Sequence, residues 1–154
     1  MLKMEDAQIK AAQEAAREQL KQQQIAFNAM VGEHGGSAAV AEASSVVEVH
    51  GKAVFALGFI IGNLTFMPDT FNLKYFVERL WGVGLTGGIS YVAGAIERPS
   101  AGDTWECQAN NSPGTVGTVL TMSFWKNNRP VGVVAGPGLS GGIGMIAGGS
   151  GKWS

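Results

Sequence analysis

The sequence predicts a mainly β protein: a compact, glycine-rich antiparallel β-barrel of about eight strands, preceded by one N-terminal α-helix. Three observations lead to this fold class. Residues 5–30 consist of strong helix formers and contain no glycine or proline. From Val46 onward the chain changes to short apolar runs with alternating side chains, separated by turn residues. All but three of the 23 glycines lie after residue 45, as a strongly curved sheet would require.

Residues 1–31 are predicted to form a helical arm, in which Ile9, Ala16, Leu20 and Phe27 share one narrow apolar stripe. The stripe is too thin to make the helix stable alone, and the other face carries glutamine and charge. Three interpretations stay open: a loosely docked arm, a self-associating coiled coil, and a helix that lies on a membrane surface. Residues 32–45 are small and polar and predict a flexible linker.

Residues 46–154 are predicted to form the antiparallel β-barrel domain. The clearest strand covers residues 115–126, where β-branched and aromatic residues alternate between two faces. Residues 126–130 (KNNRP) then predict a hairpin turn. We expect strands at residues 46–57, 60–67, 72–80, 83–96, 103–109, 115–126, 130–136 and 139–147. Strands of this number and spacing, without helices between them, indicate a sandwich or a barrel, and the glycine content favours the barrel.

The totals exclude several classes of function. The chain has 11 basic and 12 acidic residues, a net charge of -1, so it offers no electrostatic basis for binding nucleic acid. The single cysteine, Cys107, can form no internal disulfide, and without clustered histidines it predicts no zinc site. Residues 82–87 and 142–147 match the dinucleotide-binding glycine pattern, but neither is followed by a helical segment, so we expect no cofactor.

No catalytic constellation is predicted, and we expect a protein that is not an enzyme. His34 lies in the linker and His50 in the first strand, and neither is placed near a nucleophile by the sequence. Five acidic residues of the β domain could in principle pair as glycosidase carboxylates, but most of them lie at strand ends or turns, where charge is expected without catalysis. They are Asp69, Glu78, Glu97, Asp103 and Glu106.

The aromatic residues provide the candidate contact sites. Trp81, Trp105 and Trp125 lie in the β domain, where large aromatic side chains usually belong to the core but can also bind sugars or lie at a membrane interface. Trp125 is the strongest candidate because it precedes a polar turn. Together with Phe27 of the helical arm, these three tryptophans are the residues we expect to contact a membrane or a ligand.

The last third of the chain resembles the virulence-associated (Vap) proteins of intracellular actinobacterial pathogens. The resemblance rests on Phe124 and Trp125, the polar turn, residues 131–133 (VGV) and the closing residues 148–153 (GGSGKW). A polar segment leading into residues 47–53 (VEVHGKA) also fits, so that the resemblance covers residues 46–154. It implies an eight-stranded antiparallel barrel without a catalytic site, in an exported effector that acts on host endolysosomal membranes. It assigns no functional residue.

Three functions follow as hypotheses. The first is a non-enzymatic, virulence-associated effector that contacts lipid through the apolar segments 55–61 and 139–147, which otherwise would be buried strands. The second is a carbohydrate- or protein-binding module, and the third is an oligomeric, pore-forming, toxin-like protein that uses the N-terminal helix. The partner that we expect from these hypotheses is a lipid membrane or a host component. Residues 1–6 show no signal peptide, so secretion is implied by the resemblance alone, and we expect a soluble protein.

Overall fold

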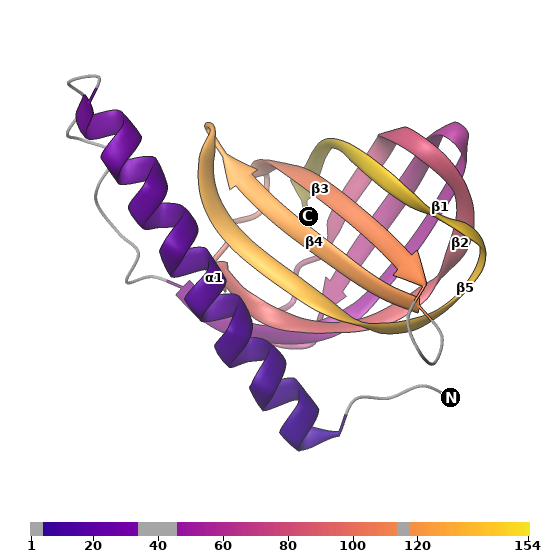
Figure 1. The fold of residues 1–154 in the computed structure, drawn as a ribbon, viewed down its shortest axis with the longest axis horizontal. Coiled ribbons are helices and arrows are strands. Elements are labelled where there is room, and N and C mark those ends of the chain that lie inside the picture. The colour runs from indigo at the N-terminus through magenta and orange to yellow at the C-terminus, as the bar shows by residue number, and fades with distance from the viewer. Residues whose placement is uncertain (1–4, 34–45, 114–117) are drawn as a thin grey trace.

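A computed structural model describes residues 5–33, 46–113 and 118–154 of the chain. One helix precedes a single antiparallel sheet (Figure 1). The mainly β class and the N-terminal helix are therefore confirmed. The elements are α1 (Asp6–Glu33), β1 (Val46–Pro68), β2 (Tyr75–Glu97), β3 (Thr104–Pro113), β4 (Thr118–Lys126) and β5 (Arg129–Trp153).

The expected number of strands is wrong, because the described sheet has five strands and not about eight. β1, β2 and β5 are 23, 23 and 25 residues long, and each joins two of the short runs that the sequence suggests. The apparent breaks between these runs are glycine-rich bends and bulges through which pairing continues. A bend without a chain reversal looks like a turn in the sequence, which explains the miscount.

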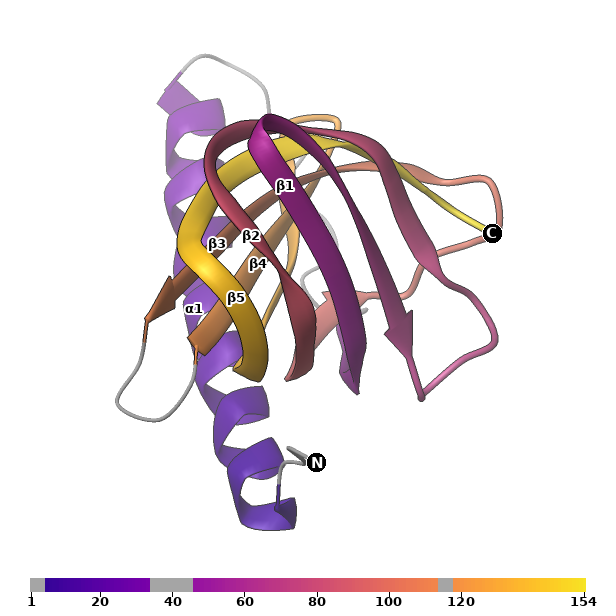
Figure 2. The ribbon, with the colours of Figure 1, turned by 90° about the vertical axis from the view of Figure 1, so that its right-hand side faces the viewer.

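The sheet has the strand order β1-β2-β5-β3-β4, and β5 pairs with β4 as well. β5 is long enough for its first half to pair with β4 and its second half with β3. All five ladders are antiparallel. The sheet curves strongly around its own interior (Figure 2). Closure of this sheet into a barrel stays a prediction.

The core lies inside the curved sheet and is centred on aromatic side chains. Trp105, Trp153, Tyr75 and Phe124 are almost completely buried. The ring centroids of Trp105 and Trp153 lie 5.3 Å apart in an edge-to-face arrangement, and Tyr75 lies 5.3 Å from both Trp153 and Phe124. Such arrangements contribute beyond the area they bury. This cluster joins β2, β3, β4 and β5 at one end of the domain.

Glycine permits close contact between the two ends of β1. A Cβ atom on Gly51 would lie 2.2 Å from the carbonyl oxygen of Met67, so no larger residue fits there. Next to it, the backbone N–H of Asp69 donates to the carbonyl of His50 over 2.8 Å. The curvature of β1 therefore depends on a residue without a side chain.

Helix α1 lies along the outside of the sheet, against β5 and β2 (Figure 1). Its described contact face includes Ile9, Gln13 and Ala16, at helical spacings of four and three. Ala16 packs on Ala95 and Val133, so small side chains let the helix approach the sheet closely. Within the described residues, no helix is both long and apolar enough to span a membrane. Residues 32 and 33, the first two of the expected 32–45 linker, belong to α1, and residues 34–45 lie outside the described part.

Candidate ligand-binding surfaces

The structure places the residues that the sequence puts forward as contact sites in different environments. Trp81 on β2 is 53% exposed and Trp125 on β4 is half-buried, and both line the same groove. Phe27 belongs to α1, but its side chain lies outside what the structure describes. Trp81 and Trp125 are thus brought together, although 44 positions separate them in the sequence.

Trp105 is a core residue and cannot contact a membrane or a ligand in this fold. Only 1% of its surface is exposed, and its ring packs on Phe124 and Trp153. Its backbone carbonyl accepts a hydrogen bond from the Tyr75 hydroxyl over 2.7 Å. The reason is strand parity: Trp105, Cys107 and Ala109 alternate inward on β3, whereas Glu106 and Gln108 point outward.

A group of exposed apolar side chains covers the region where β1, β2 and β5 bend. Val83 and Ile146 are cross-strand partners and are 76% and 71% exposed. Ile61 and Trp81 pair in the same way across β1 and β2. We call this group the apolar patch; its members are Phe59, Ile60, Ile61, Trp81, Val83, Leu85 and Ile146.

An irregularity in the pairing of β1 with β2, between Phe59 and Ile61, contributes to the apolar patch. Before this irregularity Phe55 and Leu57 point inward, and after it Leu64 and Phe66 do, so the inward-facing residues change from odd to even positions. Phe59 lies at this change with a φ of 68° and is 71% exposed. A bulky residue at positive φ is a strained exception in proteins, and such strain gathers at functional sites.

No charged residue occurs in the strand segments that carry the apolar patch. Residues 53–68 of β1, 80–96 of β2 and 130–151 of β5 contain no Asp, Glu, Lys or Arg. Charged side chains commonly protect an edge strand, which β1 is here, against association with another chain. A contiguous apolar surface without charge indicates contact with an apolar partner.

A groove crosses the outer face of β2, β5, β3 and β4 beside the apolar patch, with a volume of about 880 Å³. Two cross-strand rows form it. In one row, Trp81 lies opposite Gly148, and Gly148 lies opposite Gln108. In the other row, Ser150 lies opposite Glu106, and Glu106 lies opposite Trp125.

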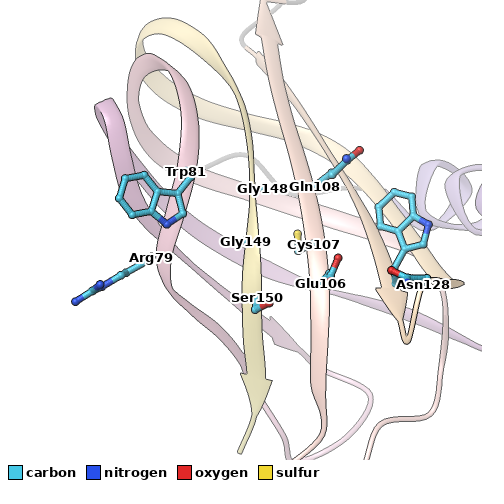
Figure 3. Close-up of a pocket in the computed structure, with 10 residues that line it drawn as sticks. Arg79, Trp81, Glu106, Cys107, Gln108, Asn128, Gly148, Gly149 and Ser150 are labelled. Atoms are coloured by element: carbon cyan, nitrogen blue, oxygen red, sulfur yellow. The ribbon is translucent and has the colours of Figure 1, made fainter.

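The groove is hollow because β5 provides almost no side chains to its floor. Figure 3 shows Trp81 on one side of the β5 ribbon and Glu106 and Gln108 on the other, with Gly148 and Gly149 between them. Cys107 also lies beneath the groove, but it points into the core, and burial raises the pKa of its thiol far above the ordinary range. Cys107 is therefore a neutral, structural residue.

Three ion pairs join ionisable residues within the described β domain, and the third links Lys126 to Asp103 over 3.6 Å. The Arg129 guanidinium donates two hydrogen bonds to Glu97, of 2.6 and 3.1 Å. His50 Nδ1 lies 3.3 Å from a carboxylate oxygen of Asp69 at the surface. Over the described ranges, no three His, Cys, Asp or Glu side chains gather as a metal site would require. What these surfaces offer chemically is binding, by apolar contact at the patch and by mixed contacts in the groove.

The sequence contains a signal for part of the groove. Glu106, Gln108 and Asn110 alternate with Trp105, Cys107 and Ala109, and this pattern already places the polar side chains on one outward face. Gly148 and Ser150 lie beside these polar side chains because β5 pairs with β3. Alternation within a single strand does not predict that pairing.

No protein-family model matches the chain, and no curated protein matches its sequence. Among solved structures, the chain is similar to the virulence-associated protein VapB from the intracellular pathogen Rhodococcus equi. The sequence identity is 14%, the TM-score is 0.46, and the match covers 71% of this chain and 97% of that chain. A virulence-associated protein is thus among the structural neighbours of the chain.

Proposed function

We propose that this protein is a non-catalytic binding protein that attaches to lipid membranes through the apolar patch. The observation that carries the proposal is the exposure of seven large apolar side chains on three adjacent strand segments that contain no charge. Lipid is the partner that such a surface fits best, because hydrocarbon requires neither hydrogen bonds nor counter-charges. In this proposal the exposed side chains at the bend of the sheet, and not a helix, contact the membrane.

The expected affinity is moderate and independent of lipid charge. Burying one exposed Ile or Phe side chain contributes about 1.5–3 kcal/mol, so inserting three of them contributes on the order of 6 kcal/mol. Trp81 lies at the border between the apolar patch and the polar groove, a position that suits an indole ring at the headgroup level. Since the described residues place no basic cluster beside the patch, anionic lipid adds little.

The role in a cell is a further part of the proposal. The Vap resemblance of residues 46–154 favours an exported, virulence-associated effector whose target is the host endolysosomal membrane. The apolar patch supplies that role with a contact surface, and it requires neither a pore nor an enzymatic step. A toxin-like oligomer that inserts α1 would instead need the helix to leave the sheet.

Vesicle sedimentation tests the proposal. Full-length protein is mixed with phosphatidylcholine vesicles, with or without phosphatidylserine, at neutral and at acid pH. We expect sedimentation with both compositions and a strong loss for Val83→Thr/Ile146→Thr, which removes apolar surface but keeps β-branched side chains. The matched control is Val54→Thr/Val119→Thr. These two residues lie outside the patch, and each is 40% exposed.

Two results would overturn the proposal. One is the absence of sedimentation under all four conditions. The other is equal sedimentation of the patch variant and its control, which would place the contact elsewhere. Binding that requires phosphatidylserine would contradict the charge-free mechanism and indicate an electrostatic site.

A further inference from the structure

We infer that the groove between Trp81 and Trp125 is a binding site for a neutral oligosaccharide. This site is separate from the membrane contact, although the two share Trp81. It is open along the sheet and has a volume of about 880 Å³, within the range of small-ligand sites. A second hollow of about 550 Å³ shares Trp81, Gln108 and Gly148 with it, so the groove extends beyond one sugar ring.

The two tryptophans suit the apolar faces of sugar rings. Trp81 and Trp125 stand on the first and last of four adjacent strands, β2 and β4, with β5 and β3 between them. At an interstrand spacing of about 4.8 Å, three such steps span roughly 14 Å. Indole rings provide large apolar faces at little conformational cost, and their N–H groups remain available to hydroxyls. A chain of sugar rings could thus lie from one indole to the other.

The polar residues of the groove suit hydroxyl groups. Glu106 and Gln108 stand on β3 in adjacent outward positions, and Asn128 lies in the turn after β4. A carboxylate accepts two hydrogen bonds, and a side-chain amide both donates and accepts, so these groups can bind adjacent hydroxyls of one ring. Arg79 also lines the groove, so that its lining includes one cation and one carboxylate. This balance favours a ligand without net charge.

The pairing of the strands disfavours an extended peptide as the occupant. β3 is bonded to β5 on one side and to β4 on the other, so its main-chain groups beneath the groove are already engaged, while the β2–β5 ladder is irregular between Phe76 and Trp81. A peptide could not extend the sheet there, which is the usual source of its affinity. Recognition in the groove must therefore come from the side chains that surround the glycine residues of β5. A ring-shaped ligand can be bound in this way.

Titration calorimetry with neutral hexasaccharides of glucose, mannose and N-acetylglucosamine tests the inference on the full chain. We expect saturable binding of at least one of them. Gln108→Ala and Glu106→Gln, both at exposed positions, should each weaken that binding about tenfold, or ~1.4 kcal/mol. Trp125→Ala should weaken it more, and a thermal unfolding curve shows whether this half-buried residue can be removed without unfolding.

The controls separate this site from the membrane contact. Val54→Thr/Val119→Thr should bind the saccharide as the unaltered chain does, and Gln108→Ala should still sediment with vesicles. The inference is overturned if none of the three hexasaccharides binds saturably, or if Gln108→Ala and Glu106→Gln both bind with unchanged affinity. Either result leaves the lipid proposal untouched, because that proposal depends on Val83 and Ile146.

Discussion

Ile61 on β1 and Trp81 on β2 are cross-strand partners whose side chains are both exposed, at 43% and 53%. A facing pair of an aromatic and a β-branched residue normally stabilises a sheet through mutual contact. Here much of the apolar area of the pair remains open to solvent, next to the strained backbone of Phe59. The arrangement is costly for a protein that contacts water alone and useful for one that contacts lipid.

Replacing Phe59 by asparagine should stabilise the fold while it weakens vesicle binding. Asparagine tolerates the φ of 68° that strains phenylalanine, and it removes an exposed apolar side chain. We expect the free energy of unfolding to rise by up to about 1 kcal/mol. Urea denaturation measures the first effect and vesicle sedimentation the second.

Phe76→Asn is the control for this substitution. Phe76 is also exposed, at 43%, but its φ is not positive. Asparagine is a poor strand residue, so this variant should lose stability where Phe59→Asn gains it. If Phe59→Asn is the less stable of the two, the positive φ of Phe59 does not strain the fold.

Gly151→Ala should destabilise the β domain by about 1–3 kcal/mol, because overpacking forces buried groups to move. A Cβ atom at residue 151 would lie 2.5 Å from Cζ of Tyr75 and 2.7 Å from its hydroxyl oxygen. That ring cannot retreat, because its hydroxyl is bonded to the carbonyl of Trp105. Gly58→Ala is the matched control, since the nearest atom to its added Cβ is 3.9 Å away. Equal thermal midpoints of the two variants would contradict the packing described at Tyr75.

Stability should fall in alkaline solution because of Tyr75 and Cys107. Burial raises the pKa of the Tyr75 phenol and of the Cys107 thiol, so both stay neutral in the folded state. The unfolded chain loses these protons near the ordinary pKa values of about 8.5 for cysteine and about 10 for tyrosine. Their contribution is therefore complete below those values and declines as the pH rises above them.

The alkaline decline can be assigned to its two groups by substitution. Cys107→Ala should delay the onset of the decline, and Tyr75→Phe should make its later part shallower. Tyr75→Phe also loses the bond to the Trp105 carbonyl, at a cost of about 1 kcal/mol near neutral pH. Urea denaturation across the pH range measures both effects, and curves parallel to that of the unaltered chain would refute the assignment.

Alternation and composition predict the β class, the single N-terminal helix and the hairpin between β4 and β5, because these depend on neighbouring residues. Alternation and composition do not predict that three strands continue through their glycines. A glycine such as Gly58 is typical of a turn, and the sequence does not show whether the chain reverses there or only bends. Trp81 and Trp125 are identified from residue type alone. Their placement in one groove, and the burial of Trp105, follow from pairing between distant strands and from strand parity.

Ala16→Leu should release α1 from the sheet without unfolding the β domain. Ala16 is 5% exposed and fits between Ala95 and Val133, where a larger side chain has no room. Leucine is nearly as good a helix former as alanine, so the change acts on docking and not on helix propensity. Amide hydrogen exchange should become faster along α1, while the thermal midpoint of the sheet changes little.

Ala15→Leu provides the comparison, because Ala15 is exposed on the other side of the same turn. This variant should retain the exchange protection of the unaltered helix. The remaining contacts of α1 are weak: Gln13 donates to the carbonyl of Val49 over 3.4 Å, and the exposed Arg17–Glu48 ion pair contributes little. Protection that survives Ala16→Leu would therefore mean that residues other than Ala16 hold the helix. Vesicle binding that appears only in Ala16→Leu would assign the membrane contact to α1 and remove it from the apolar patch.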